Sequence, residues 1–208
     1  MTTSRPTPAT KTIGVILAGG QSSRMGQDKA TLRIAGESLL LRARRILLAA
    51  GCDEVLLSGY PRQDWPDAHI PDRHPGTGPV GGIVSTLYDA ATHHDHPSPC
   101  LLFIPVDAPL LSPTLLASML HKATKCAAGC RIAHSPLPVV LKSTEHVLKQ
   151  CALAMSALAS GQSCSVKRFV EPLDLIAFDD NESIKAQLVN VNTPAEWEGL
   201  LRELETCT

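Results

Sequence analysis

A glycine-rich turn that carries two cations is the part of the sequence best suited to chemistry. Gly19 and Gly20 follow an apolar run directly, and Arg24 and Lys29 stand shortly after them. Glycines let a backbone approach a ligand closely, and consecutive free N–H groups form a nest that binds anions. A guanidinium can hold phosphate oxygens as a fork, whereas an ammonium acts as a mobile point charge. The turn therefore predicts a phosphate-binding loop.

The spacing within this turn excludes two common phosphate-binding motifs. Lys29 does not stand in G-K-[ST], so the turn is not a Walker A loop, and its glycines do not follow G-x-G-x-x-G. An ordinary exposed turn with incidental charges is the alternative. The combination of Arg, Gly, Asp and Lys at these offsets after an apolar strand favours phosphate binding.

Asp107 is the candidate metal ligand. It directly follows the apolar run of residues 100–106 and precedes Ala108-Pro109. A carboxylate at the carboxyl end of a strand lies at the edge of the sheet where ligands bind. Mg²⁺ prefers one or two carboxylates together with phosphates and water. A turn-forming aspartate before proline is the alternative, but the glycine-rich turn favours the metal ligand.

The elements that must position these residues alternate between strand and helix. This alternation predicts an α/β fold, a Rossmann-like three-layer sandwich with a mainly parallel sheet covered on both faces. Residues 129–141 do not fit the repeat and are expected to form an antiparallel excursion that closes over a ligand. The expected strands are 12–18, 54–58, 68–70, 100–106, 173–178 and 188–191, and the expected helices are 38–50, 80–91, 112–126, 143–160 and one that opens with a capping box at 193–196.

Composition limits the class of protein. The 208 residues suit a single domain, which we expect to span 12–208 behind a disordered polar extension at 1–11. A net charge of −1 provides no global field for nucleic acid or an anionic membrane. No apolar run reaches transmembrane length, and the first residues lack the apolar stretch of a signal peptide. An odd number of cysteines, seven, suits reduced thiols, so we expect a cytoplasmic protein without nucleic-acid or membrane partners.

The glycine-rich turn resembles the signature L-A-G-G-x-x-x-R-M-G-x-D-K of the molybdenum cofactor guanylyltransferases, which belong to the nucleotidyltransferase superfamily. Asp28 stands where the sugar and isoprenoid branches usually have proline, and Gly19 where the cytidylyl branch usually has alanine. P-V-D-A-P at 105–109 is similar to the family's P-x-D-x-P. The resemblance spans residues 12–197, is weakest from 120 to 187, and implies a fold of the nucleotide-diphospho-sugar transferase type.

The resemblance also implies roles for individual residues. Backbone atoms at 17–20 would contact the nucleotide, Lys29 and Arg24 would contact its phosphates, and Asp107 would bind Mg²⁺. Asp72 would contact the nucleoside, and Gly81 or Gly82 would let a helix pack near the base. The nucleotide-binding set implied in this way is Leu17, Ala18, Gly19, Gly20, Lys29, Ser58, Asp72, Gly82 and Asp107.

Two further positions concern selectivity and the second substrate. Ser58 stands where the family commonly has an asparagine, so guanine selectivity could be weaker here. Asn190 and Asn192 lie in V-N-V-N-T-P, which the family shares, and residues two apart on a strand point to the same face. They could hold the second substrate or complete the metal site. The equal alternative is that Asn192 and Thr193 only end a strand and cap a helix.

Two groups of potential metal ligands are interpreted as non-functional. His93, His94 and His96 are expected in a solvated loop, because only Asp95 stands beside them. Cys126 and Cys130 lack a second pair at zinc spacing and are expected to be free thiols.

The implied activity is transfer of GMP from GTP to the phosphate of molybdenum-molybdopterin, with release of pyrophosphate and dependence on Mg²⁺. One alternative is a transferase that uses CTP or another phosphate acceptor, and a second is a non-catalytic GTP-binding assembly factor. The implied partners are GTP and molybdopterin, with cofactor-synthesis proteins and apo molybdoenzymes as further candidates.

Overall fold

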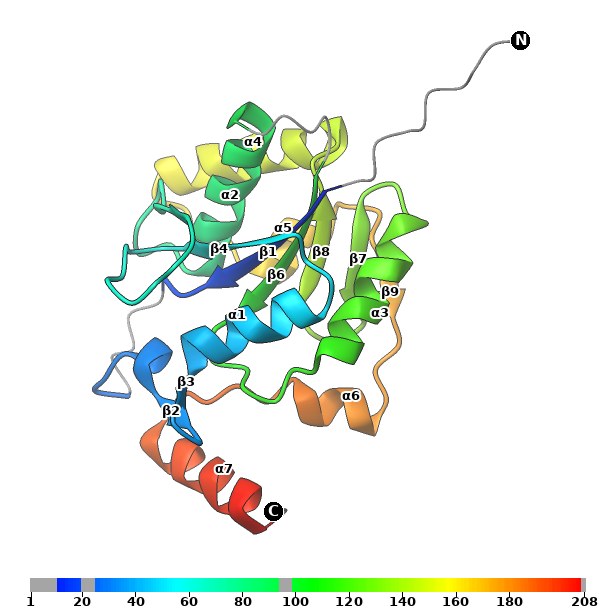
Figure 1. Ribbon diagram of the computed structural model, residues 1–208. Coiled ribbons are helices and arrows are strands. Elements are labelled where there is room, and N and C mark those ends of the chain that lie inside the picture. Colours follow the sequence, from blue (N-terminus) through cyan, green and yellow to red (C-terminus); the bar gives the residue numbers. More distant parts are fainter. Residues whose placement is uncertain (1–10, 20–24, 94–98, 207–208) are drawn as a thin grey trace.

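A seven-stranded sheet forms the centre of the protein (Figure 1). The computed structural model describes residues 11–19, 25–93 and 99–206. The strand order is β5-β4-β1-β6-β8-β7-β9, and among the described strands only β8 runs against the others. The strands are β1 (Thr12–Leu17), β4 (Glu54–Ser58), β5 (His69–Ile70), β6 (Cys100–Pro105), β7 (Gly129–Ile132), β8 (Val139–Lys142) and β9 (Ile176–Phe178).

Helices cover both faces of this sheet, which confirms the predicted three-layer α/β architecture (Figure 1). One face carries α1 (Leu39–Ala49) and α3 (Pro113–Thr124). The other carries α2 (Pro79–His93), α4 (Glu145–Ala159) and α5 (Val166–Val170). Two further helices, α6 (Glu182–Gln187) and α7 (Pro194–Thr206), follow β9.

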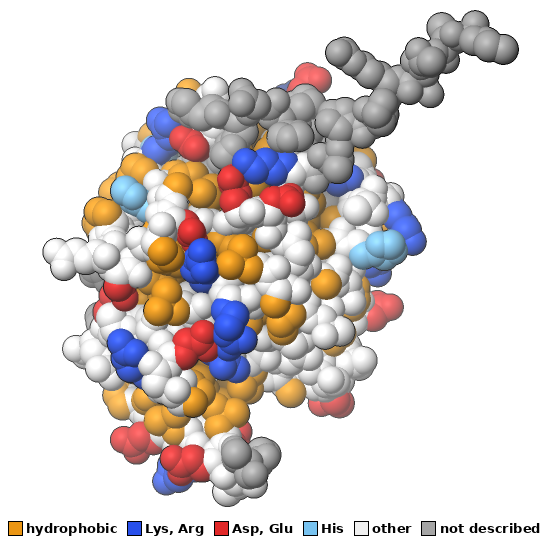
Figure 2. All heavy atoms as spheres, in the orientation of Figure 1, with side chains coloured by type: hydrophobic (Ala, Val, Ile, Leu, Met, Phe, Trp, Pro, Cys, Tyr) orange, Lys and Arg blue, Asp and Glu red, His pale blue; other side chains and the backbone are white. Residues whose placement is uncertain are grey.

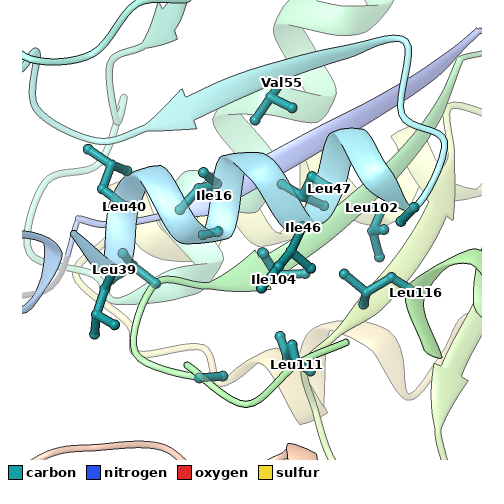
Figure 3. Close-up of a cluster of buried hydrophobic side chains, with 14 of the residues drawn as sticks. Ile16, Leu39, Leu40, Ile46, Leu47, Val55, Leu102, Ile104, Leu111 and Leu116 are labelled. Carbon is teal, nitrogen blue, oxygen red and sulfur yellow. The ribbon is translucent and has the colours of Figure 1, made fainter. Parts of the chain in front are cut away.

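Alternation along β1 explains the two cores. Ile13, Val15 and Leu17 enter the core beneath α2, whereas Ile16 packs in the core beneath α1, because successive strand side chains point to opposite faces. Figure 3 shows Ile16 among apolar side chains of α1, such as Leu47. A β-carbon at Gly14 would lie 3.0 Å from Leu47 Cδ1, so glycine lets α1 approach β1 closely.

The expected helix boundaries agree with the structure because their signals are local. Ser38 caps α1 by accepting a hydrogen bond from Leu41 N, and Ser112 caps α3 by accepting one from Leu115 N. Gly51 and Gly161 adopt the positive φ that ends a helix. The antiparallel excursion is confirmed as β7 and β8, which pair antiparallel with each other, and β8 also pairs antiparallel with β6.

The expected strand at 188–191 is wrong. This stretch is irregular, and one of its amides, Val191 N, donates to Asp107 O over 2.9 Å, without a strand ladder. The strand expected at 173–178 shortens to β9, because Leu173 N instead closes a turn on Val170 O. Four short elements were not predicted: the 3₁₀ turn η1 (Lys29–Thr31), the hairpin β2 (Arg33–Ile34) with β3 (Glu37–Ser38), α5 and α6.

Charge and cysteine patterns can also be compared with expectation. Figure 2 shows basic and acidic side chains mixed over the visible face, without a large area of one sign. The six cysteines within the described ranges are all free, as predicted. Within the same ranges, no helix combines the length and apolar character needed to cross a membrane. Of the extension predicted at 1–11, all but Lys11 lies outside the described residues.

Candidate active site

A pocket of about 490 Å³ lies where β1, β4 and β6 end at their carboxyl edge. This is the position at which open parallel sheets bind ligands. Of the predicted site residues, Leu17, Ala18, Gly19, Lys29, Ser58, Asp72, Gly82, Asp107 and Asn190 line the pocket. Arg24 and Gly20 lie outside the described residues.

Two glycines allow the turns after β1 and β4 to pack against each other at the pocket floor. Ala18 N donates to Ser58 O over 3.1 Å, which extends the pairing of the two strands into the turns. Gly59 adopts φ 129°, and a β-carbon there would lie 3.1 Å from Gly19 N. Only glycine accommodates both that backbone conformation and that approach. The floor of the pocket is therefore bare backbone at Gly19.

Lys29 and Asp107 form an ion pair at the edge of the pocket. Lys29 Nζ lies 2.6 Å from Asp107 Oδ2 and 2.7 Å from Asn192 Oδ1. Both charged side chains are only partly exposed, 15% for Lys29 and 17% for Asp107. The structure thus brings together the predicted phosphate cation, the predicted metal ligand and one of the two predicted asparagines.

Asn192 contacts Lys29 from a segment whose backbone amides are hydrogen-bonded to Glu196. Glu196 accepts hydrogen bonds from Asn192 N and Thr193 N, while Thr193 Oγ1 accepts one from Glu196 N. These bonds form the predicted capping box at the start of α7. Asn192 and Thr193 thus take part in the cap of α7, as one alternative expected, although no strand precedes them. The Asn192 side chain contacts Lys29, and a role in holding the second substrate or the metal stays a prediction.

Asp28 shapes the turn that presents Lys29. Asp28 Oδ1 accepts a hydrogen bond from Ala30 N over 3.1 Å and so caps η1. Asp28 Oδ2 pairs with Arg62. Burial raises the pKa of Asp28, but the hydrogen bonds from Arg62 and Ala30 N outweigh it, and the net pKa is lowered. Asp28 is therefore held as a carboxylate between two loops.

The residues predicted to contact the nucleoside, Asp72 and Ser58, line the pocket beside the first turns of α2. A β-carbon at Gly81 would lie 2.7 Å from both carboxylate oxygens of Asp72. One at Gly82 would press on Ser58 Oγ and lie 3.1 Å from Leu17 Cδ2. Burial is the main cause of the raised pKa of Asp72, although His74 N donates to its Oδ1. The two glycines thus let α2 sit directly on the predicted nucleoside residues.

Two further segments line the pocket, one inside the excursion that was expected to close over a ligand and one that sequence reasoning missed. They are residues 135–137, between β7 and β8, and residues 165–167, at the start of α5. Ser165 Oγ caps α5 by accepting a hydrogen bond from Arg168 N over 3.2 Å. The serine was a detectable cap signal, but α5 is too short for a hydrophobic period to show. Lys167 therefore adds a cation to the pocket that no motif had indicated.

The metal-binding potential of the site rests on Asp107. Among the described residues, no group of three or more His, Cys, Asp or Glu side chains is arranged to hold a metal. A single carboxylate beside the predicted phosphate-binding loop nevertheless fits Mg²⁺, because substrate phosphates and water would complete its coordination. Within the described part of the chain, the hydrogen bonds of Asp107 leave its Oδ1 available. Cys126 and Cys130 belong to no such group among the described residues, and the histidine cluster lies largely outside them.

The fold is shared with known nucleotidyltransferases. Molybdopterin-guanine dinucleotide biosynthesis protein A from Archaeoglobus fulgidus superposes with a TM-score of 0.70, 15% identity, and coverage of 94% of this chain and 100% of that one. The 2-C-methyl-D-erythritol 4-phosphate cytidylyltransferase from Thermus thermophilus superposes with a TM-score of 0.59, 17% identity, and coverage of 90% and 98%. At such identities the likeness concerns the fold.

The sequence comparisons identify the family. The family described as the MobA-like NTP transferase domain matches residues 14–173. A molybdenum cofactor guanylyltransferase from Xanthomonas euvesicatoria pv. vesicatoria (strain 85-10) is 37% identical over 191 residues, which cover 91% of this chain and 94% of that relative. A probable molybdenum cofactor guanylyltransferase from Mycobacterium avium (strain 104) is 31% identical, with coverage of 90% and 93%. The chain is a nucleotidyltransferase and belongs to the molybdenum cofactor guanylyltransferase family.

Proposed function

We propose that this protein transfers GMP from GTP to the phosphate of molybdenum-molybdopterin and releases pyrophosphate. The observation that carries the proposal is the contact of Lys29 Nζ with both Asp107 and Asn192 at the carboxyl edge of the sheet. It places a mobile cation, a hard carboxylate and an amide side by side, next to the glycine floor of the pocket.

The main task of this site is to bring two anions together. Lys29 and the backbone around Gly19 offset the charge of the triphosphate and align it, so that catalysis comes from positioning and preorganised electrostatics. Asp107 would hold Mg²⁺ together with the phosphates, and the bound metal would supply further neutralisation of their charge. Arg24, by resemblance, would add a second cation to the same loop.

The proposed transfer needs no covalent enzyme intermediate. A phosphate oxygen of the acceptor attacks the α-phosphorus of GTP in line and forms the new P–O bond. The bond between the α-phosphorus and the bridging oxygen to the β-phosphorus breaks, and its electron pair leaves with pyrophosphate. The negative charge that develops on the phosphate oxygens in the transition state would lie near Lys29. A positioned donor there stabilises the transition state more than it stabilises the bound substrate.

The residues that line the pocket suggest which of them each substrate would contact. Ser58, Asp72 and Gly82 would receive the nucleoside, because they lie together under α2. Lys167 and Asn190 line the same pocket and would receive the acceptor. A cytoplasmic location and contact with cofactor-synthesis proteins or apo molybdoenzymes remain predictions from the sequence.

Pyrophosphate release tests this function. Purified protein is incubated with Mg²⁺ and each of the four NTPs, with and without molybdenum-loaded molybdopterin. Release with GTP that depends on the pterin supports the proposal, whereas release with CTP alone would move the chain to cytidylyl transfer. Tight GTP binding without release, under conditions in which a related guanylyltransferase turns over, would favour the non-catalytic alternative.

A further inference from the structure

Arg62 is an arginine outside the pocket that is nevertheless connected to its catalytic loop. It lies in the loop between β4 and β5 and does not line the pocket. Its Nη1 donates to Asp28 Oδ2. The Arg62 side chain is only 16% exposed, whereas that of Asp28 is 45% exposed. The arginine is therefore the more enclosed member of the pair, unlike a cation that merely samples the solvent near a carboxylate.

A short chain of contacts leads from Arg62 to Lys29. Asp28 uses one carboxylate oxygen for Arg62 and the other for Ala30 N. Asp28 O also accepts from Thr31 N over 3.0 Å and from Thr31 Oγ1 over 2.8 Å. These bonds define η1, whose first residue is Lys29. Fixing the Asp28 carboxylate therefore fixes the backbone from which Lys29 reaches Asp107.

The loop that carries Arg62 is anchored independently of the pocket. Trp65 is buried, donates from Nε1 to Ala68 O, and donates from its amide to Arg62 O. Arg44 of α1 holds the same loop through a two-bond contact with Asp67. Arg62 thus projects from a rigid support, as a positioning group requires.

Arg62 also carries a feature that stability alone does not explain. Its Nε is buried and has no hydrogen-bond partner among the described residues. A buried donor without a partner costs free energy, and each such group in a native structure needs an explanation. A partly exposed ion pair contributes little to stability in return. The buried position of Arg62 therefore costs some free energy of folding, as strained or unsatisfied groups at functional sites commonly do.

We propose that Arg62 is a positioning residue for nucleotidyl transfer, which holds Asp28 so that η1 presents Lys29 to Asp107 and to the phosphates. This inference rests on the proposed function, because Lys29 is the cation that it serves. Arg62 itself touches no substrate. Its removal should lower kcat and leave the KM for GTP nearly unchanged, because the pocket walls that bind the nucleoside stay in place.

Three variants test the contact itself. Arg62→Met removes the charge and keeps the length of the side chain. Asp28→Asn removes the carboxylate, but asparagine caps a helical turn as well as aspartate does. We expect each change to lower kcat by about 10- to 100-fold, since a displacement of about 1 Å near the chemistry can cost as much as 10²-fold. The double variant should lose little more than either single one, because both remove the same contact.

Two matched controls separate positioning from general loosening. Arg44→Met removes the other anchor of the same loop, and Arg45→Met removes a two-bond surface pair with Glu37. Both should keep wild-type kcat, because in Arg44→Met the Trp65 anchor still holds the loop directly beside Arg62. Arg62→Lys should recover part of the loss because it restores the charge without the fork. An equal loss in Arg44→Met would overturn the proposal, since loop order would then be the cause. Additive losses in the double variant would overturn it as well.

An activity-independent readout follows the position of Lys29 directly. Limited acetylation is measured by mass spectrometry for Lys29 and for exposed Lys149 as the internal reference. We expect Arg62→Met to raise Lys29 acetylation several-fold relative to Lys149, and Arg44→Met to leave it unchanged. Unchanged Lys29 acetylation in Arg62→Met would overturn the proposal. Wild-type protein that releases no pyrophosphate would instead contradict the proposed function, while the acetylation result would still decide whether Arg62 positions Lys29.

Discussion

Lys29 Nζ lies 2.6 Å from Asp107 Oδ2, although 78 positions separate the two residues in the chain. The contact follows from the sheet, because β1 and β6 are parallel neighbours and Leu17 lies opposite Pro105. The loops that follow β1 and β6 therefore lie together at the carboxyl edge of the sheet. Asp107, the proposed metal ligand, is therefore already paired with Lys29. When a nucleotide binds with its metal, Asp107 must either contact Lys29 and the metal together or give up its contact with Lys29.

Replacing Lys29 should remove transition-state stabilisation. We expect Lys29→Ala to lower kcat by about 10²–10³-fold, the usual effect of losing one preorganised donor. Lys29→Arg should recover only part of it, because a planar fork cannot reproduce a point contact with Asp107 and Asn192. Steady-state pyrophosphate release measures both variants, with exposed Lys149→Ala as the matched control. Turnover of Lys29→Ala within about threefold of wild type would contradict the assigned role.

Removing the metal or its ligand should abolish transfer. We expect EDTA to stop pyrophosphate release and excess Mg²⁺ to restore it, since the phosphates need a hard cation. Asp107→Ala should show near-complete loss that Mg²⁺ does not restore. Mn²⁺ binding, followed by electron paramagnetic resonance with GTP present, should weaken in the same variant. Wild-type turnover of Asp107→Ala would remove the metal assignment.

Two glycines in helices should respond oppositely to alanine. We expect Gly82→Ala to lower the free energy of unfolding by about 1–3 kcal/mol, because the new methyl presses on Ser58 Oγ and Leu17. Ser58→Ala in the same chain should relieve part of this loss. Gly199→Ala in α7 should raise stability by about 0.5–1 kcal/mol, because its β-carbon would meet open space. Urea unfolding measures all three, and a stabilising Gly82→Ala would show that α2 does not need this approach.

Asp72 should make stability depend on pH. Burial raises its pKa above the ordinary 3.8, so the folded chain binds this proton more tightly than the unfolded chain. Stability therefore falls as pH rises from the ordinary value through the raised pKa. Asparagine cannot ionise and can still accept from His74 N, so we expect Asp72→Asn to have a higher Tm than wild type at pH 7.

The Tm difference between Asp72→Asn and wild type is best measured as a series from pH 3.5 to pH 7. It should be smallest at the acid end, where Asp72 is mostly protonated in both the folded and the unfolded chain, and should grow toward neutrality. Asp72→Asn should also bind GTP more weakly, which isothermal calorimetry measures at pH 7. A difference in Tm that shrinks as pH rises would contradict the assigned direction of the pKa shift.

Local signals in the sequence determined much of the fold. Apolar runs such as 100–106 identify strands because a parallel strand is buried on both faces. Ser38 and Ser112 identify helix starts because the capping bond spans only three residues. Lys29 and Asp107 were identified as candidates because each follows, in the sequence, a strand whose carboxyl end must face ligands. Each of these inferences depends on near neighbours in the chain.

Only the tertiary structure decided which of these local pieces meet. Residues 188–191 have a strand-like composition, but Val191 N donates to Asp107 O, and the segment forms no strand ladder. Arg62 pairs with Asp28 from 34 positions away, and Lys167 enters the pocket from a helix too short to show a period. No spacing in the sequence encodes such tertiary contacts. These contacts depend on the order of the strands in the sheet, because that order determines which loops lie together at the carboxyl edge. The strand order is in turn determined by how the side chains pack in the two cores.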